Sequence, residues 1–113
     1  MNFYDEEGKL MLIEAWAKAL DGPRHIRNTR VGYGQGRKRI STVWLGIDHN
    51  FGEIGSPIIF ESMVFNKENF IDIACRRYST KEEAVVGHAE LVNHWKYNRR
   101  QRRVYANRKE SSR

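Results

Sequence analysis

Residues 40–47 constrain the fold more than any other segment, because side chains on both faces of a strand here would be largely apolar. The segment is rich in β-branched and aromatic residues, which are typical of β-strands. A strand that is apolar on both faces lies in the interior of a sheet. We therefore expect a β-sheet with this segment as its central strand. Its alternating positions are Thr42, Trp44 and Gly46 on one face and Val43, Leu45 and Ile47 on the other.

A glycine-rich loop precedes this strand and predicts a hairpin. Residues 24–31 and 38–47 have the composition of strands, and Gly32, Gly34 and Gly36 interrupt the stretch between them. We therefore expect residues 24–31 to pair with the central strand in an antiparallel hairpin.

Two more strands are expected after the loop that ends at Pro57. Residues 58–65 and 70–78 have the composition of strands and flank a short polar turn at 66–69. We expect Phe65 to lie opposite Phe70, since this register places a nearly continuous apolar set on one face. The predicted core face contains Ile58, Phe60, Ser62, Val64, Ile71, Ile73 and Cys75.

A short helix is expected before the strands. Residues 11–20 place Leu12 and Trp16 on one side of a helix, which ends where Gly22 and Pro23 follow. Because an isolated helix of this length is marginal in water, packing of Trp16 must hold it.

The second helix is expected to start at a capping box and to run to about Tyr97. Either Ser79 with Glu82 or Thr80 with Glu83 fits the box. Its apolar side contains Ala84, Val85, Ala89, Leu91, Val92 and Trp95. The sequence therefore predicts an α+β protein, in which this C-terminal helix covers an antiparallel sheet of about four strands and a short helix lies at the N-terminus.

The length of 113 residues fits one domain. We expect that domain over residues 1–97, followed by a basic tail over 98–113 that either extends the helix or is disordered. A lone cysteine, Cys75, excludes an intramolecular disulfide, and no apolar run reaches the ~18 residues of a membrane span. With its acidic first residues, the sequence predicts a cytoplasmic protein without membrane contact.

Basic residues are concentrated in two segments of a chain whose formal net charge is +6. Residues 23–47 contain six basic residues and no acidic one, and residues 84–113 contain eight basic and two acidic residues. Electric fields act over one Debye length, ~8–10 Å in physiological salt, so this clustering counts for more than the net charge. We expect both segments to attract a negatively charged partner.

Three stretches combine into a specific pattern: STVWLGIDHNFG at 41–52, PIIFESMVF at 57–65 and RYSTKEEA at 77–84. With these stretches the chain resembles a family of small uncharacterised proteins of tailed bacteriophages and prophages. The resemblance covers residues 3 to 95 and implies a phage origin, and hence the cytoplasm of a host cell. It implies no chemistry, and the arginine-rich tail departs from the family pattern.

No residue pattern points to a metal or to a cofactor, and we expect neither. An acid–base site could be built from Asp48, His49 and Glu61 near the end of the central strand. The simpler interpretation is that Asp48 stabilises a turn and that Glu61 pairs with Arg76 on the neighbouring strand. An enzyme is therefore the weakest of three hypotheses, and no residue is assigned a catalytic role.

The glycine-rich hairpin gives a second hypothesis, a protein that binds and sequesters a nucleotide. Its backbone amides and the flanking cations could hold phosphates. The loop lacks the Walker A and dinucleotide-binding patterns, and an ordinary solvated hairpin loop is the alternative.

The tail supports the first hypothesis, a non-enzymatic accessory protein. Its arginines and tyrosines are typical of segments that bind RNA or single-stranded DNA, although a disordered solubilising tail has a similar composition. The expected partner is nucleic acid or an acidic host protein. The predicted binding residues are Arg37, Lys38, Arg39, Arg99, Arg100, Arg102, Arg103 and Tyr105.

The sequence leaves the oligomeric state open. Trp44, Phe65 and Phe70 are predicted to lie on the second sheet face, away from the C-terminal helix. If the N-terminal helix does not cover them, they would form an apolar patch large enough for a homodimer.

Overall fold

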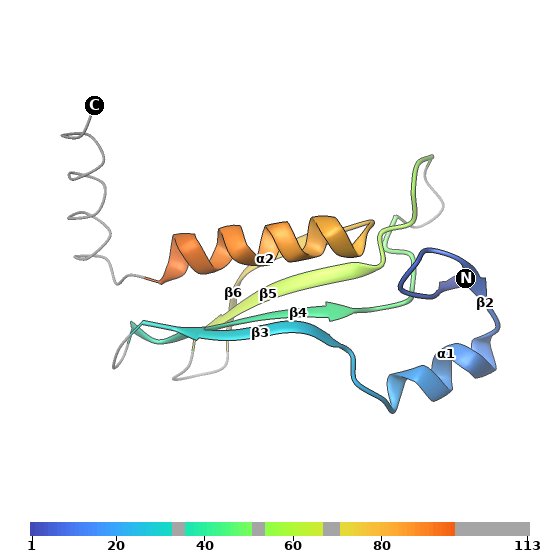
Figure 1. Cartoon of the computed structure of the whole chain (residues 1–113), viewed down its shortest axis with the longest axis horizontal. Coiled ribbons are helices and arrows are strands. Elements are labelled where there is room, and N and C mark those ends of the chain that lie inside the picture. Colours follow the sequence, from blue (N-terminus) through green and yellow to red (C-terminus); the bar gives the residue numbers. More distant parts are fainter. Residues whose placement is uncertain (33–35, 51–53, 67–70, 97–113) are drawn as a thin grey trace.

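The computed structural model describes residues 1–32, 36–50, 54–66 and 71–96. One long helix lies across one face of a four-stranded antiparallel sheet, and a two-stranded sheet and a short helix lie at one end (Figure 1). The α+β architecture predicted from the sequence is confirmed. In chain order the elements are β1 (Phe3–Tyr4), β2 (Leu10–Met11), α1 (Ile13–Leu20), β3 (His25–Val31), β4 (Lys38–Trp44), β5 (Phe60–Asn66), β6 (Asp72–Tyr78) and α2 (Lys81–Trp95).

The strand predicted to be central lies inside the sheet. The strand order is β3-β4-β5-β6, so β4 pairs with both β3 and β5. β4 ends at Trp44 rather than at Ile47, because the chain turns at Gly46, where φ is +73°. A Cβ on Gly46 would lie 2.6 Å from ring atoms of both Trp16 and Trp44. Only glycine therefore fits between these two indoles.

The register between β5 and β6 differs from the prediction. Phe60 lies opposite Tyr78, whereas the predicted pairing of Phe65 with Phe70 would put Phe60 opposite Cys75. The shift is odd, so it moves the β6 side chains to the other face of the sheet. Phe70 itself lies outside the described residues.

The observed register places Tyr78, rather than Ile73 and Cys75, beneath the helix. Ile73 and Ile71 are 41% and 57% exposed, and Cys75 is exposed as well. Tyr78 is favoured inside because it buries a large ring and its hydroxyl donates to Ser62 Oγ at 3.0 Å. The apolar pattern of the sequence predicted Ile71 and Ile73 in the core because such a pattern does not take the Tyr78–Ser62 hydrogen bond into account. The members of the predicted core face that are fully buried are Phe60, Ser62 and Val64.

The C-terminal helix starts at one of the two predicted caps, with Thr80 as its N-cap and Glu83 as its partner. The Thr80 hydroxyl accepts a hydrogen bond from the Glu83 backbone N–H at 3.1 Å and donates to Glu83 Oε1 at 3.0 Å. Within the described ranges, no helix is both long and apolar enough to cross a lipid bilayer. The buried residues of α2 are Ala84, Gly87, His88 and Leu91.

The N-terminal region packs against one end of the sheet. The Trp16 indole N–H donates to the Leu45 carbonyl at 3.0 Å, and the Trp16 ring lies 4.5 Å from the Phe3 ring, centroid to centroid. This packing holds the short helix, as its length requires. α1 lies beyond the strand ends and not across the sheet (Figure 1).

The sheet face opposite α2 is consequently not covered by α1, and we call it the open face. The prediction that Trp44 lies on this face is wrong. It is 4% exposed and belongs to the core cluster that includes Ala84 of α2. Phe65 does lie on the open face, in the same row as Arg39.

We expect Gly87→Ala to destabilise the protein, although alanine favours helices. The added methyl group would overlap the Tyr78 ring, whose hydroxyl is held by Ser62. Overpacking of this kind costs ~1–3 kcal/mol, against a gain of ~1 kcal/mol in helix propensity. Urea unfolding measures the change, with Val86→Ala at an exposed position of the same helix as the control. An unchanged or higher midpoint for Gly87→Ala would contradict the prediction.

Candidate functional site

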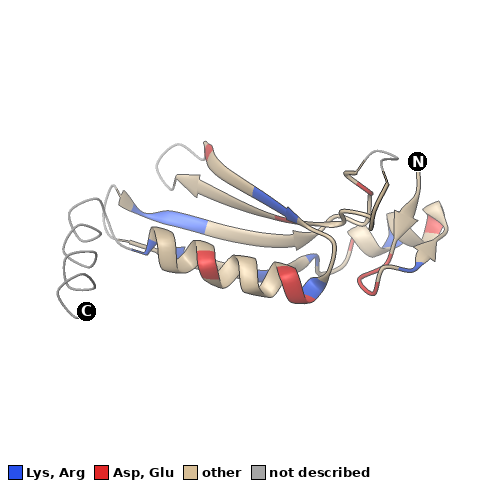
Figure 2. Cartoon of the chain, turned by 90° about the horizontal axis from the view of Figure 1, so that it is seen from above, with Lys and Arg blue, Asp and Glu red and all other residues tan. Residues whose placement is uncertain are grey.

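The β3–β4 hairpin and the C-terminal end of α2 lie at the same end of the molecule. Trp95, the last residue of α2, packs against a buried cluster that includes Val31, the last residue of β3. The cations of the β3–β4 hairpin and Lys96, which follows α2, therefore lie at one end of the molecule (Figure 2). We call this the basic end, and its described cations are Arg30, Arg37, Lys38, Arg39 and Lys96.

The three predicted hairpin residues do not form one cluster. Arg37 is exposed, and Lys38 Nζ donates to the Gly36 carbonyl at 3.0 Å. The Arg39 guanidinium lies over the Phe65 ring, 5.0 Å from its centroid. Since side chains alternate along β4, Lys38 and Arg39 lie on opposite faces of the sheet. A ligand that contacts both would wrap the end of the sheet.

Arg39 also lies directly opposite Arg30 of β3. Like charges at opposite positions of antiparallel strands destabilise the pair. The hairpin thus carries a repulsion that a bound anion would relieve.

The remaining predicted binding residues lie outside the described residues. The same holds for residues 33–35 of the glycine-rich loop, on which the nucleotide hypothesis depends, and for the conformation predicted for the tail over 98–113. The binding residues concerned are Arg99, Arg100, Arg102, Arg103 and Tyr105.

Asp48 and His49, two residues of the acid–base hypothesis, stabilise the loop that follows β4. Asp48 Oδ1 accepts hydrogen bonds from the backbone N–H groups of Asn50 and Ile58, both at 2.8 Å. The His49 backbone N–H donates to the Ile58 carbonyl at 2.8 Å, and His49 Nδ1 lies 3.0 Å from the Ile47 carbonyl oxygen. Asp48 therefore has the turn-stabilising role of the simpler interpretation.

Glu61, the third residue of that hypothesis, pairs on the open face with Arg77 at 3.0 Å. The prediction that Glu61 pairs with Arg76 is wrong, since the register places Arg77 opposite Glu61. Arg76 instead pairs with Glu90 of α2 at 3.7 Å. The exposed Cys75 thiol lies beside Glu61. Partial burial, and after it the Glu61 charge, raises the pKa of Cys75, which makes this thiol a poor nucleophile at neutral pH.

Among the described residues, no three His, Cys, Asp or Glu side chains converge on a point where a metal ion could bind.

A buried chain of polar side chains between α2 and the sheet was not predicted. His88 of α2 is 4% exposed and lies 2.8 Å from Thr29 Oγ1 of β3 and 2.7 Å from Thr42 Oγ1 of β4. Thr42 Oγ1 lies 2.5 Å from Ser62 Oγ of β5, which accepts the hydrogen bond from Tyr78 of β6. One residue from each strand of the sheet is thus linked to the helix. We call these five residues the buried polar chain.

The buried polar chain has a consistent set of donors and acceptors when His88 is neutral. The Tyr78 hydroxyl donates to Ser62, and the Ser62 hydroxyl donates to Thr42. The Thr42 hydroxyl donates to Nδ1 of His88, and the Nε2–H of His88 donates to Thr29. A protonated His88 would need Thr42 as an acceptor at Nδ1. The Ser62 hydroxyl hydrogen would then lose its partner in the chain.

A signal for His88 was present in the sequence. Ala84, His88 and Leu91 follow the i, i+4, i+7 spacing of one helix side, so the apolar stripe passes through the histidine. A histidine within such a stripe needs buried partners, and Thr42 and Ser62 at inward positions of β4 and β5 supply them.

Comparison of the sequence and the structure with known protein families, curated proteins and solved structures finds no match. The function of this chain therefore has to be inferred from its own residues and geometry.

The free energy of unfolding should fall as the pH drops below 6.5. Burial, and after it the charge of Arg27, lowers the pKa of His88 below its ordinary value of 6.5. Between the two pKa values the unfolded chain takes up a proton that the folded chain does not. The stability due to neutral His88 is therefore fully present above pH 6.5 and is lost as the pH falls toward the folded pKa.

Urea unfolding at about pH 7.5 and at about pH 5.5 checks this prediction. His88→Gln should remove the part of the pH dependence that comes from this group. His25→Gln, at an exposed position of β3, should retain it. Equal pH dependence in the two variants would show that His88 is not the group responsible.

Proposed function

We propose that this protein is a non-enzymatic, phage-encoded accessory protein that binds nucleic acid as a polyanion through its basic end. The phage origin is supported by the sequence resemblance alone. The binding function is supported chiefly by one observation: Trp95, the last residue of α2, packs against the buried cluster that includes Val31, so α2 ends beside the basic β3–β4 hairpin. The hairpin cations and the tail arginines can then act on the same ligand.

Charge is separated along the molecule in a way that favours such binding. Asp5, Glu6 and Glu7 lie between β1 and β2, and Glu14 lies in α1, at the end opposite the hairpin (Figure 2). The 15 residues of α2 alone span ~22 Å, more than two Debye lengths of ~8–10 Å. The acidic end therefore does little to screen the basic end, and it orients the molecule in the field of a polyanion.

Arginine chemistry favours phosphate as the bound group. The guanidinium fork binds phosphate with two parallel hydrogen bonds, and Arg30 and Arg39 place two such forks on neighbouring strands. Bound phosphate would also remove the repulsion between them. An acidic host protein would be attracted by the same charges, so the binding experiment includes a polycarboxylate probe.

The test of this proposal is the salt dependence of binding to nucleic acid. We expect the full chain to bind DNA and RNA with an affinity that falls steeply between about 50 and 300 mM salt. Arg37→Gln combined with Lys38→Gln should weaken binding and reduce the slope of log K against log salt by ~0.7–0.9 for each phosphate that the variant no longer neutralises. Fluorescence anisotropy with labelled oligonucleotides measures both quantities.

The matched control makes the same change of charge at the acidic end. Lys9→Gln combined with Lys18→Gln removes two positive charges near β2 and on α1. An equal loss of affinity in the control, or binding without salt dependence, would contradict the assignment of the basic end. Polyglutamate that binds as tightly as nucleic acid would instead indicate an acidic protein partner.

A further inference from the structure

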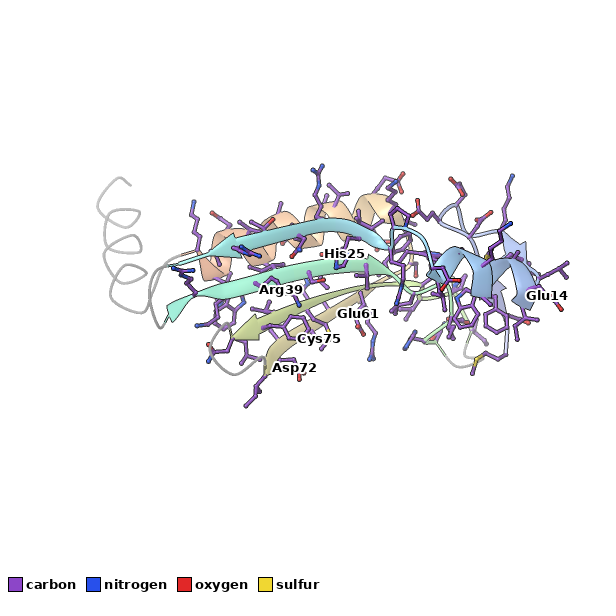
Figure 3. All side chains as sticks on the ribbon, turned by 90° about the horizontal axis from the view of Figure 1, so that it is seen from below. Glu14, His25, Arg39, Glu61, Asp72 and Cys75 are labelled. Atoms are coloured by element: carbon purple, nitrogen blue, oxygen red, sulfur yellow. The ribbon has the colours of Figure 1, made fainter. Side chains whose placement is uncertain are left out.

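The open face of the sheet carries three rows of side chains that run across all four strands. Residues opposite one another in an antiparallel sheet share a face, so the pairing register defines the rows. Figure 3 shows this face with Arg39, Glu61, Asp72 and Cys75 on it. From the hairpin end inward the rows are Arg30–Arg39–Phe65–Asp72, Asn28–Ser41–Met63–Cys75 and His25–Val43–Glu61–Arg77.

The first row combines phosphate-binding groups with an aromatic ring. Phe65 is half-buried, and the Arg39 guanidinium lies over its ring. Arg39 is in turn directly opposite Arg30, which is exposed. The row therefore places two cationic forks beside one π-face, all within the basic end.

We infer that the open face binds a single-stranded polynucleotide, with a base stacked on Phe65 and the adjoining phosphates held by Arg39 and Arg30. This inference rests on the proposed function and names the class of nucleic acid that the basic end takes. Stacking of a base on an aromatic ring is stronger than an exposed cation–π contact, so the base can displace Arg39 from the ring. The displaced guanidinium then reaches a phosphate.

The other two rows fit this ligand. The second row is uncharged at neutral pH and offers the exposed Asn28 amide and the half-buried Met63 side chain, which suit the edge and the face of a base. In the third row the ion pair of Glu61 with Arg77 neutralises two charges. The cationic part of the face is thus confined to the hairpin end, where α2 ends as well.

A duplex cannot use this surface in the same way. Its bases are stacked on one another and paired, so no base face is free to lie on Phe65. Duplex DNA would contact the arginines through its phosphates alone. The ring therefore makes the difference between single-stranded and double-stranded ligands.

The experiment compares binding of the full chain to labelled oligo(dT), oligo(U) and a DNA duplex, each of about 16 nucleotides per strand, by fluorescence anisotropy. Phe65→Leu should weaken binding to the single strands about fivefold or more and leave duplex binding unchanged. Phe65→Tyr retains the ring and should retain the affinity. The two single-stranded probes distinguish DNA from RNA as the preferred ligand.

Charge variants provide a matched pair on one sheet. Arg39→Gln should weaken binding to single strands, and Arg76→Gln should not, because Arg76 pairs with Glu90 on the helix side. Asp72 ends the first row as the one carboxylate in it, so Asp72→Asn should strengthen binding roughly twofold or more.

Three results would overturn the inference while leaving the proposed function intact. One is salt-dependent binding that is insensitive to both Phe65→Leu and Asp72→Asn. Another is equal loss of duplex and single-strand binding in Phe65→Leu. If Phe65→Leu instead converts a dimer to a monomer in light scattering without changing binding, the open face joins two copies of the chain and the inference is wrong. Absence of any polynucleotide binding would remove the proposed function as well.

Discussion

The buried polar chain fixes how the helix sits on the sheet, because its members satisfy one another's hydrogen bonds in this arrangement. An apolar cluster around Trp44 lies to one side of it and a cluster around Val31 to the other. Apolar contacts alone tolerate small slides of a helix over a sheet. A slide that separates His88 from Thr42 would leave buried hydroxyl and imidazole groups unpaired, at ~1–3 kcal/mol for each group. The polar groups therefore add specificity to a core whose stability comes mainly from its apolar residues.

The inward orientation of Thr42 and Ser62 also determines what lies on the other side. Because side chains alternate along β4 and β5, Arg39 and Phe65 must point away from the helix. The candidate binding surface is thus the sheet face opposite the core, and the register that selects the core residues also selects the residues on this face. Contact between Arg39 and Phe65 shields part of the ring from water, which explains how this aromatic residue persists on an exposed sheet face.

The features that the sequence predicted correctly are those encoded by residues close together in the chain. The central position of β4, the short N-terminal helix and the N-cap at Thr80 each depend on a few neighbouring residues. The pairing of β5 with β6 depends instead on Tyr78, whose burial requires both Ser62 and the absence of a side chain at Gly87. Ser62 and Gly87 are both distant from Tyr78 in the sequence, so the local hydrophobic pattern does not reveal that they contact it. At the candidate site, the basic residues could be identified from the sequence. The row in which Arg39 lies beside an aromatic ring could not, because it follows from the pairing of β4 with β5.

Both edge strands are irregular and lined with arginine, and this bears on how the protein behaves when crowded. The pairing of β3 shifts next to Ile26, and that of β6 shifts between Val64 and Phe65 of its partner strand. A long, regular edge would let a second chain add a strand to the sheet, which is how amyloid-like fibres begin. Irregular pairing and charges at both borders oppose that step, so copies of the chain can be concentrated without their sheets fusing. The edge arginines are Arg27 and Arg30 on β3 and Arg76 and Arg77 on β6.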